Sequence, residues 1–196
     1  MIARKYELGK DLLDQYALES HQRAIKATQS GLFQNEIVPI EITAADGSTQ
    51  MHVVDEGIRF DATLESIRNV KLIQEGGRVT AASASQICDG ASGLLVVNEK
   101  GLKQLGLSPL ARVHHISVRG DDPVIMLEAP IPVTQWALKK AGMRIQDIDL
   151  YEVNEAFAPI PLAWLKVLDA DPAKLNVNGG GIALDLLRGP DKLRGK

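Results

Sequence analysis

The stretch from Tyr151 to Asp185 constrains the fold most strongly, because strand-like and helix-like segments alternate in it with polar junctions between them. Residues 147–153 are typical of a strand, residues 155–168 of an apolar helix, and residues 174–178 of a second strand. Asn154 lies at the first strand-to-helix junction, where unpaired backbone N–H groups commonly bind anions or developing oxyanions. The pattern predicts an α/β fold in which helices cover the faces of a mixed sheet.

The same alternation extends towards the N-terminus. Residues 93–97 and 111–118 have the apolar character of strands, and residues 100–105 and 134–141 have the spacing of short helices. Thr134 is a candidate N-cap for the second of these helices. Together with the stretch described above, these elements predict one α/β sheet over the second half of the chain.

The first third of the chain has a different character. A helix is predicted over residues 7–30, an edge strand over residues 37–42 and a short helix over residues 64–70, with little continuous apolar sequence between them. We therefore expect three parts: a partial cap or loop domain over residues 1–77, a sheet-and-helix domain over residues 78–184, and a divergent polar tail over residues 185–196.

The overall composition excludes several classes of function. The chain has a net charge of −3 and 24% charged residues, so no basic field indicates binding to nucleic acid or to a membrane surface. No apolar run approaches the roughly 18 residues that a membrane span needs. The single cysteine, Cys88, fits a reducing compartment, and we expect a cytoplasmic protein. None of the four histidines has the spacing of a metal site, so no metal is expected.

Two short motifs carry a specific resemblance to a known family. The string NEAFA at residues 154–158 and the string NVNGG at residues 176–180 resemble motifs of the thiolase family, which includes acetyl-CoA acetyltransferases and 3-ketoacyl-CoA thiolases. A third block, residues 83–91, is similar to a further thiolase motif, with Ser83 and Cys88 in place of two asparagines. The resemblance extends from Met1 to Leu184 and implies a thiolase-like but incomplete fold, comprising the middle and part of the C-terminal half.

The resemblance also implies roles for individual residues. Asn154 would hold a water molecule of the oxyanion hole. The substrate pocket would be lined by Phe157, Met126 and Gly180. Arg59 and Ser66 would contact the nucleotide end of coenzyme A, and Ser85 would contact its pantetheine arm. Simpler interpretations remain open for several of them. Asn154 could cap the following helix, Phe157 and Met126 could be core residues, and Arg59 could be a solvated surface charge.

The expected function follows from the family. The resemblance implies acyl-CoA acyltransfer, in which 3-ketoacyl-CoA is cleaved or formed in fatty acid metabolism, with coenzyme A or acyl-CoA as substrate and no tightly bound cofactor. It also implies a homodimer or homotetramer. Thiolase chemistry needs a cysteine thiolate and a base, yet Cys88 matches neither catalytic cysteine, and Asp185-Leu186-Leu187 replaces the Gly-His-Pro segment of the family. We therefore expect the isolated chain to be inactive.

Thiolase motifs are therefore present while the family's catalytic cysteines and histidine are not matched. Three explanations of this combination remain open from the sequence. The chain could be a truncated or frameshifted fragment of a thiolase, and the polar tail departs from the family pattern as a changed reading frame would make it. It could be a non-catalytic thiolase-like protein that binds coenzyme A or a partner. It could also be one half of a split enzyme.

Overall fold

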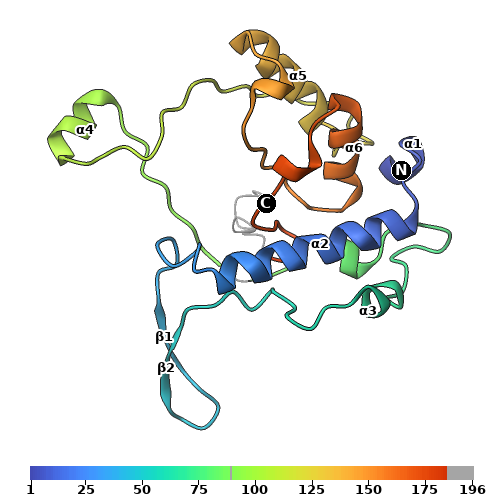
Figure 1. The fold of residues 1–196 in the computed structure, drawn as a ribbon, viewed down its shortest axis with the longest axis horizontal. Helices are drawn as coiled ribbons and strands as arrows, with labels where there is room; N and C mark the ends of the chain where they lie inside the picture. The colour runs from blue at the N-terminus through green and yellow to red at the C-terminus, as the bar shows by residue number, and fades with distance from the viewer. Residues whose placement is uncertain (89, 185–196) are drawn as a thin grey trace, which may run out of the picture.

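The computed structural model describes residues 1–88 and 90–184 of the 196-residue chain (Figure 1). A short helix α1 (Ile2–Lys5) leads into the long helix α2 (Lys10–Gln29), which lies along the body of the molecule. Leu13, Tyr16, Ala17, Ser20 and Ala24 are buried at the spacing of one helical face. The helix predicted over residues 7–30 is confirmed, and it supplies one wall of the core.

A β-hairpin projects from this body (Figure 1). Strand β1 (Ile40–Thr43) pairs antiparallel with strand β2 (Thr49–His52), with Ile40 opposite His52 and Thr43 opposite Thr49. The turn between them is stabilised by two hydrogen bonds, in which the carboxylate of Asp46 accepts from the backbone N–H and the hydroxyl of Ser48. The predicted edge strand at 37–42 is therefore displaced by a few residues, and its partner β2 was not predicted.

Three further helices agree with the sequence patterns, and the starts of the second and third lie before the predicted residue. Helix α3 (Leu64–Arg68) begins at a capping box made by Thr63 and Ser66. Helix α4 (Glu99–Leu105) begins at Asn98, whose side chain accepts from the backbone of Gly101. Helix α5 (Pro130–Ala141) begins one turn earlier than predicted, with a proline in its first turn. Thr134 is therefore not an N-cap: its hydroxyl donates to the carbonyl of Pro130 inside the helix at 2.7 Å.

Helix α6 (Pro159–Leu168) packs beside α5. Trp164 of α6 donates its indole N–H to Thr134 of α5 at 3.0 Å, and its ring lies 5.2 Å from that of Tyr151. Short 3₁₀ turns, η1 (Ala81–Ser83), η2 (Ile145–Asp147) and η3 (Pro172–Lys174), connect these helices to the segments between them. The apolar sequence of residues 155–168 therefore forms a helix that starts at Pro159 rather than at residue 155.

The mixed sheet predicted for the second half is only partly present. Tyr151 and Leu175 form one isolated parallel bridge where strands 147–153 and 174–178 were predicted. The segments predicted as strands at 93–97 and 111–118 make no backbone hydrogen bond to any described residue. The pairing predicted for segments 93–97 and 111–118 is therefore wrong for the described residues, because a ladder needs a neighbouring strand for its N–H and C=O groups. The pairing predicted between 147–153 and 174–178 is present only as the one bridge.

One hydrophobic core joins the early and late parts of the chain. It contains Leu13 and Ile67 from the first part and Trp164, Leu175 and Ile182 from the second. The side chain of Gln86 adds a polar connection, donating to the carbonyls of Gly57 at 2.6 Å and of Ile182 at 3.1 Å. The proposed division at residue 77 stays a prediction, and the predicted tail at 185–196 lies outside the described residues.

Candidate active-site region

Asn154 lies on an extended stretch between Tyr151 and helix α6, where its side chain is exposed. Because α6 begins only at Pro159 after Ala158, Asn154 is not its N-cap. It lines a cavity of about 1040 Å³, together with residues 113–115 and Trp164. The interpretation of Asn154 as a simple helix cap is therefore wrong. Its side-chain amide, which is neutral and does not titrate, lies at the wall of this cavity.

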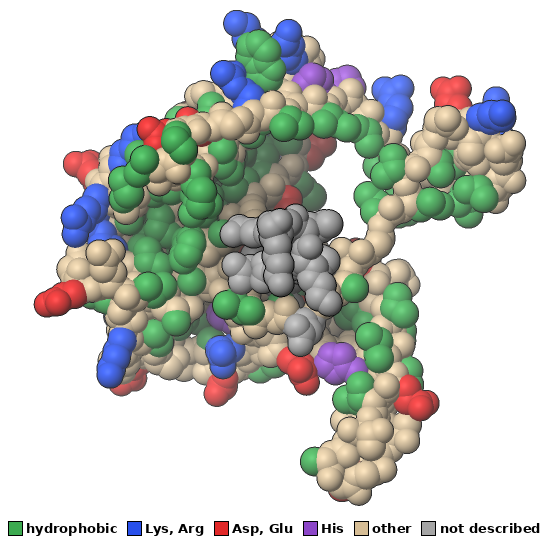
Figure 2. Space-filling model, turned by 180° about the vertical axis from the view of Figure 1, so that it is seen from behind, with side chains coloured by type: hydrophobic (Ala, Val, Ile, Leu, Met, Phe, Trp, Pro, Cys, Tyr) green, Lys and Arg blue, Asp and Glu red, His purple; other side chains and the backbone are tan. Residues whose placement is uncertain are grey.

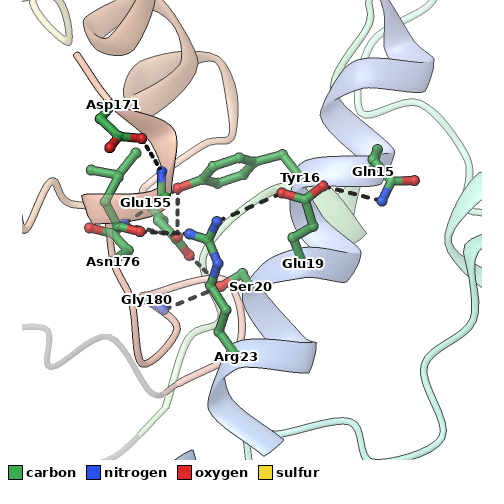
Figure 3. Close-up of polar contacts among 11 residues, drawn as sticks. Gln15, Tyr16, Glu19, Ser20, Arg23, Glu155, Asp171, Asn176 and Gly180 are labelled. Atoms are coloured by element: carbon green, nitrogen blue, oxygen red, sulfur yellow. Dashed lines mark hydrogen bonds and ion pairs between the residues drawn. The ribbon is translucent and has the colours of Figure 1, made fainter. Parts of the chain in front are cut away.

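The next residue, Glu155, is the centre of a buried polar cluster (Figure 3). Its side chain is 1% exposed, and its carboxylate accepts from the hydroxyls of Tyr16 at 2.7 Å and Ser20 at 2.6 Å. It also accepts from the side-chain amide of Asn176 at 2.9 Å and from the backbone N–H of Ile182 at 3.1 Å. These four neutral donors stabilise a carboxylate that would otherwise be costly to bury. We call these residues the Glu155 cluster.

The cluster fixes the protonation state of its tyrosine. Burial, and then the negative charge of Glu155, raise the pKa of Tyr16 well above its usual range. The phenol therefore stays protonated and donates to the carboxylate. Tyr16 and Ser20 both belong to α2, so the cluster joins α2 to the NEAFA segment.

The glycine-rich segment is shaped by the same cluster. Asn176 donates to the carbonyl of Val153 and accepts from its N–H, which holds the NVNGG segment against the NEAFA segment. The N–H of Gly180 donates to Ser20 at 3.2 Å, and a Cβ at Gly180 would lie 2.7 Å from both carboxylate oxygens of Glu155. Gly180 is therefore required by the close approach of Glu155, a constraint that the sequence did not reveal.

Two of the predicted pocket residues come together. Met126 and Phe157 both line a second cavity of about 510 Å³, together with Ile125 and Ile160. Its volume lies within the range of small-molecule sites. Asn154 lines the other cavity, and Gly180 lies in the Glu155 cluster. The structure therefore brings together Met126 and Phe157 but does not place all four predicted residues around one space.

The predicted coenzyme A contacts lie elsewhere on the surface. The side chain of Arg59 is exposed, while its backbone N–H donates to Nδ1 of His21 on α2 at 3.3 Å. Burial, and then the charge of Arg59, lower the pKa of His21, so the neutral ring that can accept this bond is favoured. The contact holds the backbone of residue 59 to the body and leaves its guanidinium in solvent.

The two serines have defined structural contacts. The hydroxyl of Ser66 accepts from the N–H of Thr63 at 3.1 Å and donates to its carbonyl at 2.8 Å, as part of the capping box of α3. The N–H of Ser85 donates to the carbonyl of Ala156 at 3.0 Å, which joins the third motif to the NEAFA segment. Neither serine, nor Arg59, lines the two cavities described above.

Comparisons with known proteins agree with the motifs. The family model for the thiolase N-terminal domain matches residues 1–100, and the model for the thiolase C-terminal domain matches residues 107–186. The chain belongs to the thiolase family.

Individual relatives define how much of the family fold is present. A steroid 3-ketoacyl-CoA thiolase of Mycobacterium tuberculosis is 50% identical over 184 residues, which are 94% of this chain and 44% of that protein. The structure of human mitochondrial 3-ketoacyl-CoA thiolase is 42% identical and has a TM-score of 0.85, covering 93% of this chain and 46% of its own. Acetyl-CoA acetyltransferase of Bacillus anthracis has a TM-score of 0.87. The chain spans about half the length of these relatives, and its fold is an incomplete α/β thiolase fold.

In the described part of the chain, no helix is both long and apolar enough to cross a bilayer.

Proposed function

We propose that this chain supplies the acyl-facing and coenzyme A-facing surfaces of an acyl-CoA acyltransferase that cleaves or forms 3-ketoacyl-CoA. The observation that carries the proposal is the shared cavity of Met126 and Phe157, two residues far apart in sequence that were both assigned to the acyl pocket. Coenzyme A and acyl-CoA are the proposed substrates, with no tightly bound cofactor, and a human relative has been solved in complex with CoA. We also propose a cytoplasmic location, which fits the single cysteine.

In this proposal Asn154 holds a water molecule that donates to the developing oxyanion of a thioester. An amide suits the role because it is neutral and stays in one protonation state. The Glu155 cluster supports the role, since four hydrogen bonds fix the residue directly after Asn154. Arg59 and Ser66 are assigned to the nucleotide end of coenzyme A and Ser85 to its pantetheine arm.

The isolated 196-residue chain is expected to show no thiolytic turnover. Acyl transfer needs a thiolate nucleophile and a base, and neither Cys88 nor any histidine matches the family's catalytic positions. Leu186, which replaces the family's histidine, lies outside the described residues. The check is an assay of purified protein with acetoacetyl-CoA and free coenzyme A. Turnover above about 1 per second that Cys88→Ala abolishes would contradict the expectation.

Coenzyme A is expected to bind the isolated chain weakly, and Arg59→Ala is expected to weaken binding further. A well-formed charge-assisted contact to phosphate contributes about 1.5–3 kcal/mol, so the dissociation constant should rise about tenfold or more. Asn154→Ala should leave it unchanged, because Asn154 is assigned to the reacting thioester. Isothermal titration with coenzyme A measures the dissociation constants of the wild type, Arg59→Ala and Asn154→Ala.

A matched control distinguishes a direct contact between Arg59 and coenzyme A from the effect of removing any one positive charge. Arg112 is exposed like Arg59, and Arg112→Ala removes the same charge outside the proposed site. Equal weakening by Arg59→Ala and Arg112→Ala, or an effect of Asn154→Ala alone, would refute the assignment of Arg59 to the nucleotide end.

A further inference from the structure

The backbone that carries Arg59 is held to the body at three successive residues. The carbonyl of Gly57 accepts from the side-chain amide of Gln86 at 2.6 Å. Ile58 is 5% exposed and packs in a small core with residues of α2 and of the segment after the NVNGG motif. The N–H of Arg59 donates to Nδ1 of His21 on α2 at 3.3 Å. The guanidinium is in solvent, but the point from which its side chain projects is fixed.

His21 supplies the one titratable acceptor among these three contacts. Its side chain is 5% exposed and lies on the buried face of α2. Because Nδ1 accepts the N–H of Arg59, the neutral ring carries its proton on Nε2. A protonated ring has N–H donors at both nitrogens and cannot accept this bond. The charge state of one buried ring therefore decides whether the backbone of Arg59 has this partner.

Two charged groups act on His21 in opposite directions. Burial, and then the positive charge of Arg59, lower the pKa of His21, while the negative charge of Glu155 raises it, and the lowering prevails. The neutral, accepting ring is therefore favoured at neutral pH. Ser20, the residue before His21, donates to Glu155 at 2.6 Å, so this carboxylate is held by the same helix.

Gln86 connects the backbone near Arg59 to the proposed pantetheine contact. Gln86 directly follows Ser85, whose N–H donates to the carbonyl of Ala156 in the NEAFA segment at 3.0 Å. The side chain of Gln86 then donates to Gly57. A short series of hydrogen bonds therefore fixes the spacing between the residues that are assigned to the two ends of coenzyme A.

The surface charge gives weight to the placement of single side chains. Figure 2 shows Lys and Arg side chains interspersed with Asp and Glu along the lower part of the body. The chain as a whole has a net charge of −3. On a surface of mixed charge, a phosphate is held by individual cations in the right position rather than by a broad basic field.

We propose that His21 and Gln86 are positioning residues that hold Arg59 at the nucleotide end of coenzyme A. Both act through the backbone of residues 57–59 and need no contact with the ligand. Protonation of His21 removes one of the two polar contacts, so the affinity for coenzyme A falls in acid. The inference deepens the proposed function and rests on it, because Arg59 must bind the nucleotide.

Two substitutions of His21 test the role of its acceptor atom. His21→Asn keeps a side-chain acceptor that does not titrate, whereas His21→Leu removes the acceptor and leaves the N–H of Arg59 without it. In isothermal titration with coenzyme A at about pH 8, His21→Leu and Gln86→Leu should each raise the dissociation constant about fivefold or more. His21→Asn should change it by less than about twofold.

The pH profile gives a readout that a merely structural role would not change. Between about pH 8 and about pH 5, the wild type should lose at least about threefold more affinity than His21→Asn, because only the wild type loses its acceptor. The loss should appear below about pH 6.5, the ordinary value for histidine, since the pKa of His21 is lowered. A phosphate monoester titrates near pH 6, but it does so equally with both proteins.

Amide hydrogen exchange measures the positioning without any ligand. Protection of the Arg59 amide should fall at least about tenfold in His21→Leu and persist in His21→Asn. His52 lies on strand β2 of the projecting hairpin and gives the control. His52→Leu removes a histidine away from residues 57–59 and should change neither the dissociation constant nor its pH dependence.

The possible outcomes separate this inference from the proposed function. Equal affinities of the wild type and His21→Leu, or equal pH profiles of the wild type and His21→Asn, would overturn the positioning role and leave coenzyme A binding in place. If His21→Leu loses protection throughout the chain, the comparison of the wild type with His21→Asn decides. Failure of the wild type to bind coenzyme A would overturn the proposed function and this inference with it.

Discussion

Gly180→Ala is expected to destabilise the protein by about 3 kcal/mol or more, which is at the upper end for overpacking a core. The new Cβ would lie 2.7 Å from both carboxylate oxygens of Glu155, well inside contact distance. The carboxylate cannot move away cheaply, because four hydrogen bonds hold it. Urea unfolding followed by circular dichroism measures the effect.

Gly120→Ala is the matched control for this substitution. A Cβ at Gly120 meets nothing within 4 Å, so the same chemical change occurs in open space. It should alter the free energy of unfolding by no more than about 0.5 kcal/mol. Similar losses for Gly180→Ala and Gly120→Ala would show that the close approach of Glu155 to Gly180 does not exist in solution.

Glu155→Ala is expected to cost about 3–5 kcal/mol of stability. The substitution removes the shared acceptor of Tyr16, Ser20 and Asn176, and each donor left buried without a partner costs about 1–3 kcal/mol. Glu155→Gln should cost less, because it keeps one acceptor oxygen. The exposed Glu75 gives the control, and Glu75→Ala should be nearly neutral. Thermal and urea unfolding measure all three variants.

The two substitutions should also be strongly coupled. In the Glu155→Ala background the carboxylate that meets the new Cβ is absent, so Gly180→Ala should cost clearly less than in the wild type. The expected interaction energy is about 1 kcal/mol or more, within the range for residues in contact. If the losses in free energy of unfolding are additive in this double-mutant cycle, Glu155 is not the reason that residue 180 must be glycine.

Local patterns predicted the helices well. The spacing of apolar residues in 7–30 predicted α2, and the left-handed glycines Gly106 and Gly142 end α4 and α5 as expected. The predicted start of α6 was several residues too early because the apolar pattern already begins at residues 156–158, whereas the Glu155 side chain is held outside the helix by Tyr16 and Ser20 of α2. Local sequence propensity cannot predict a contact between Tyr16 and Glu155, which lie far apart in the sequence.

The sequence by itself determined the family, through the NEAFA and NVNGG motifs, and the positions of most helices, because these depend on neighbouring residues. Only the tertiary structure decided that Glu155 is the buried acceptor of two hydroxyls from α2, and that Gly180 must be small to allow it. It also decided that segments 93–97 and 111–118 remain unpaired among the described residues. A sequence can specify a strand, but the strand forms a sheet only where a neighbouring chain supplies its hydrogen-bond partners.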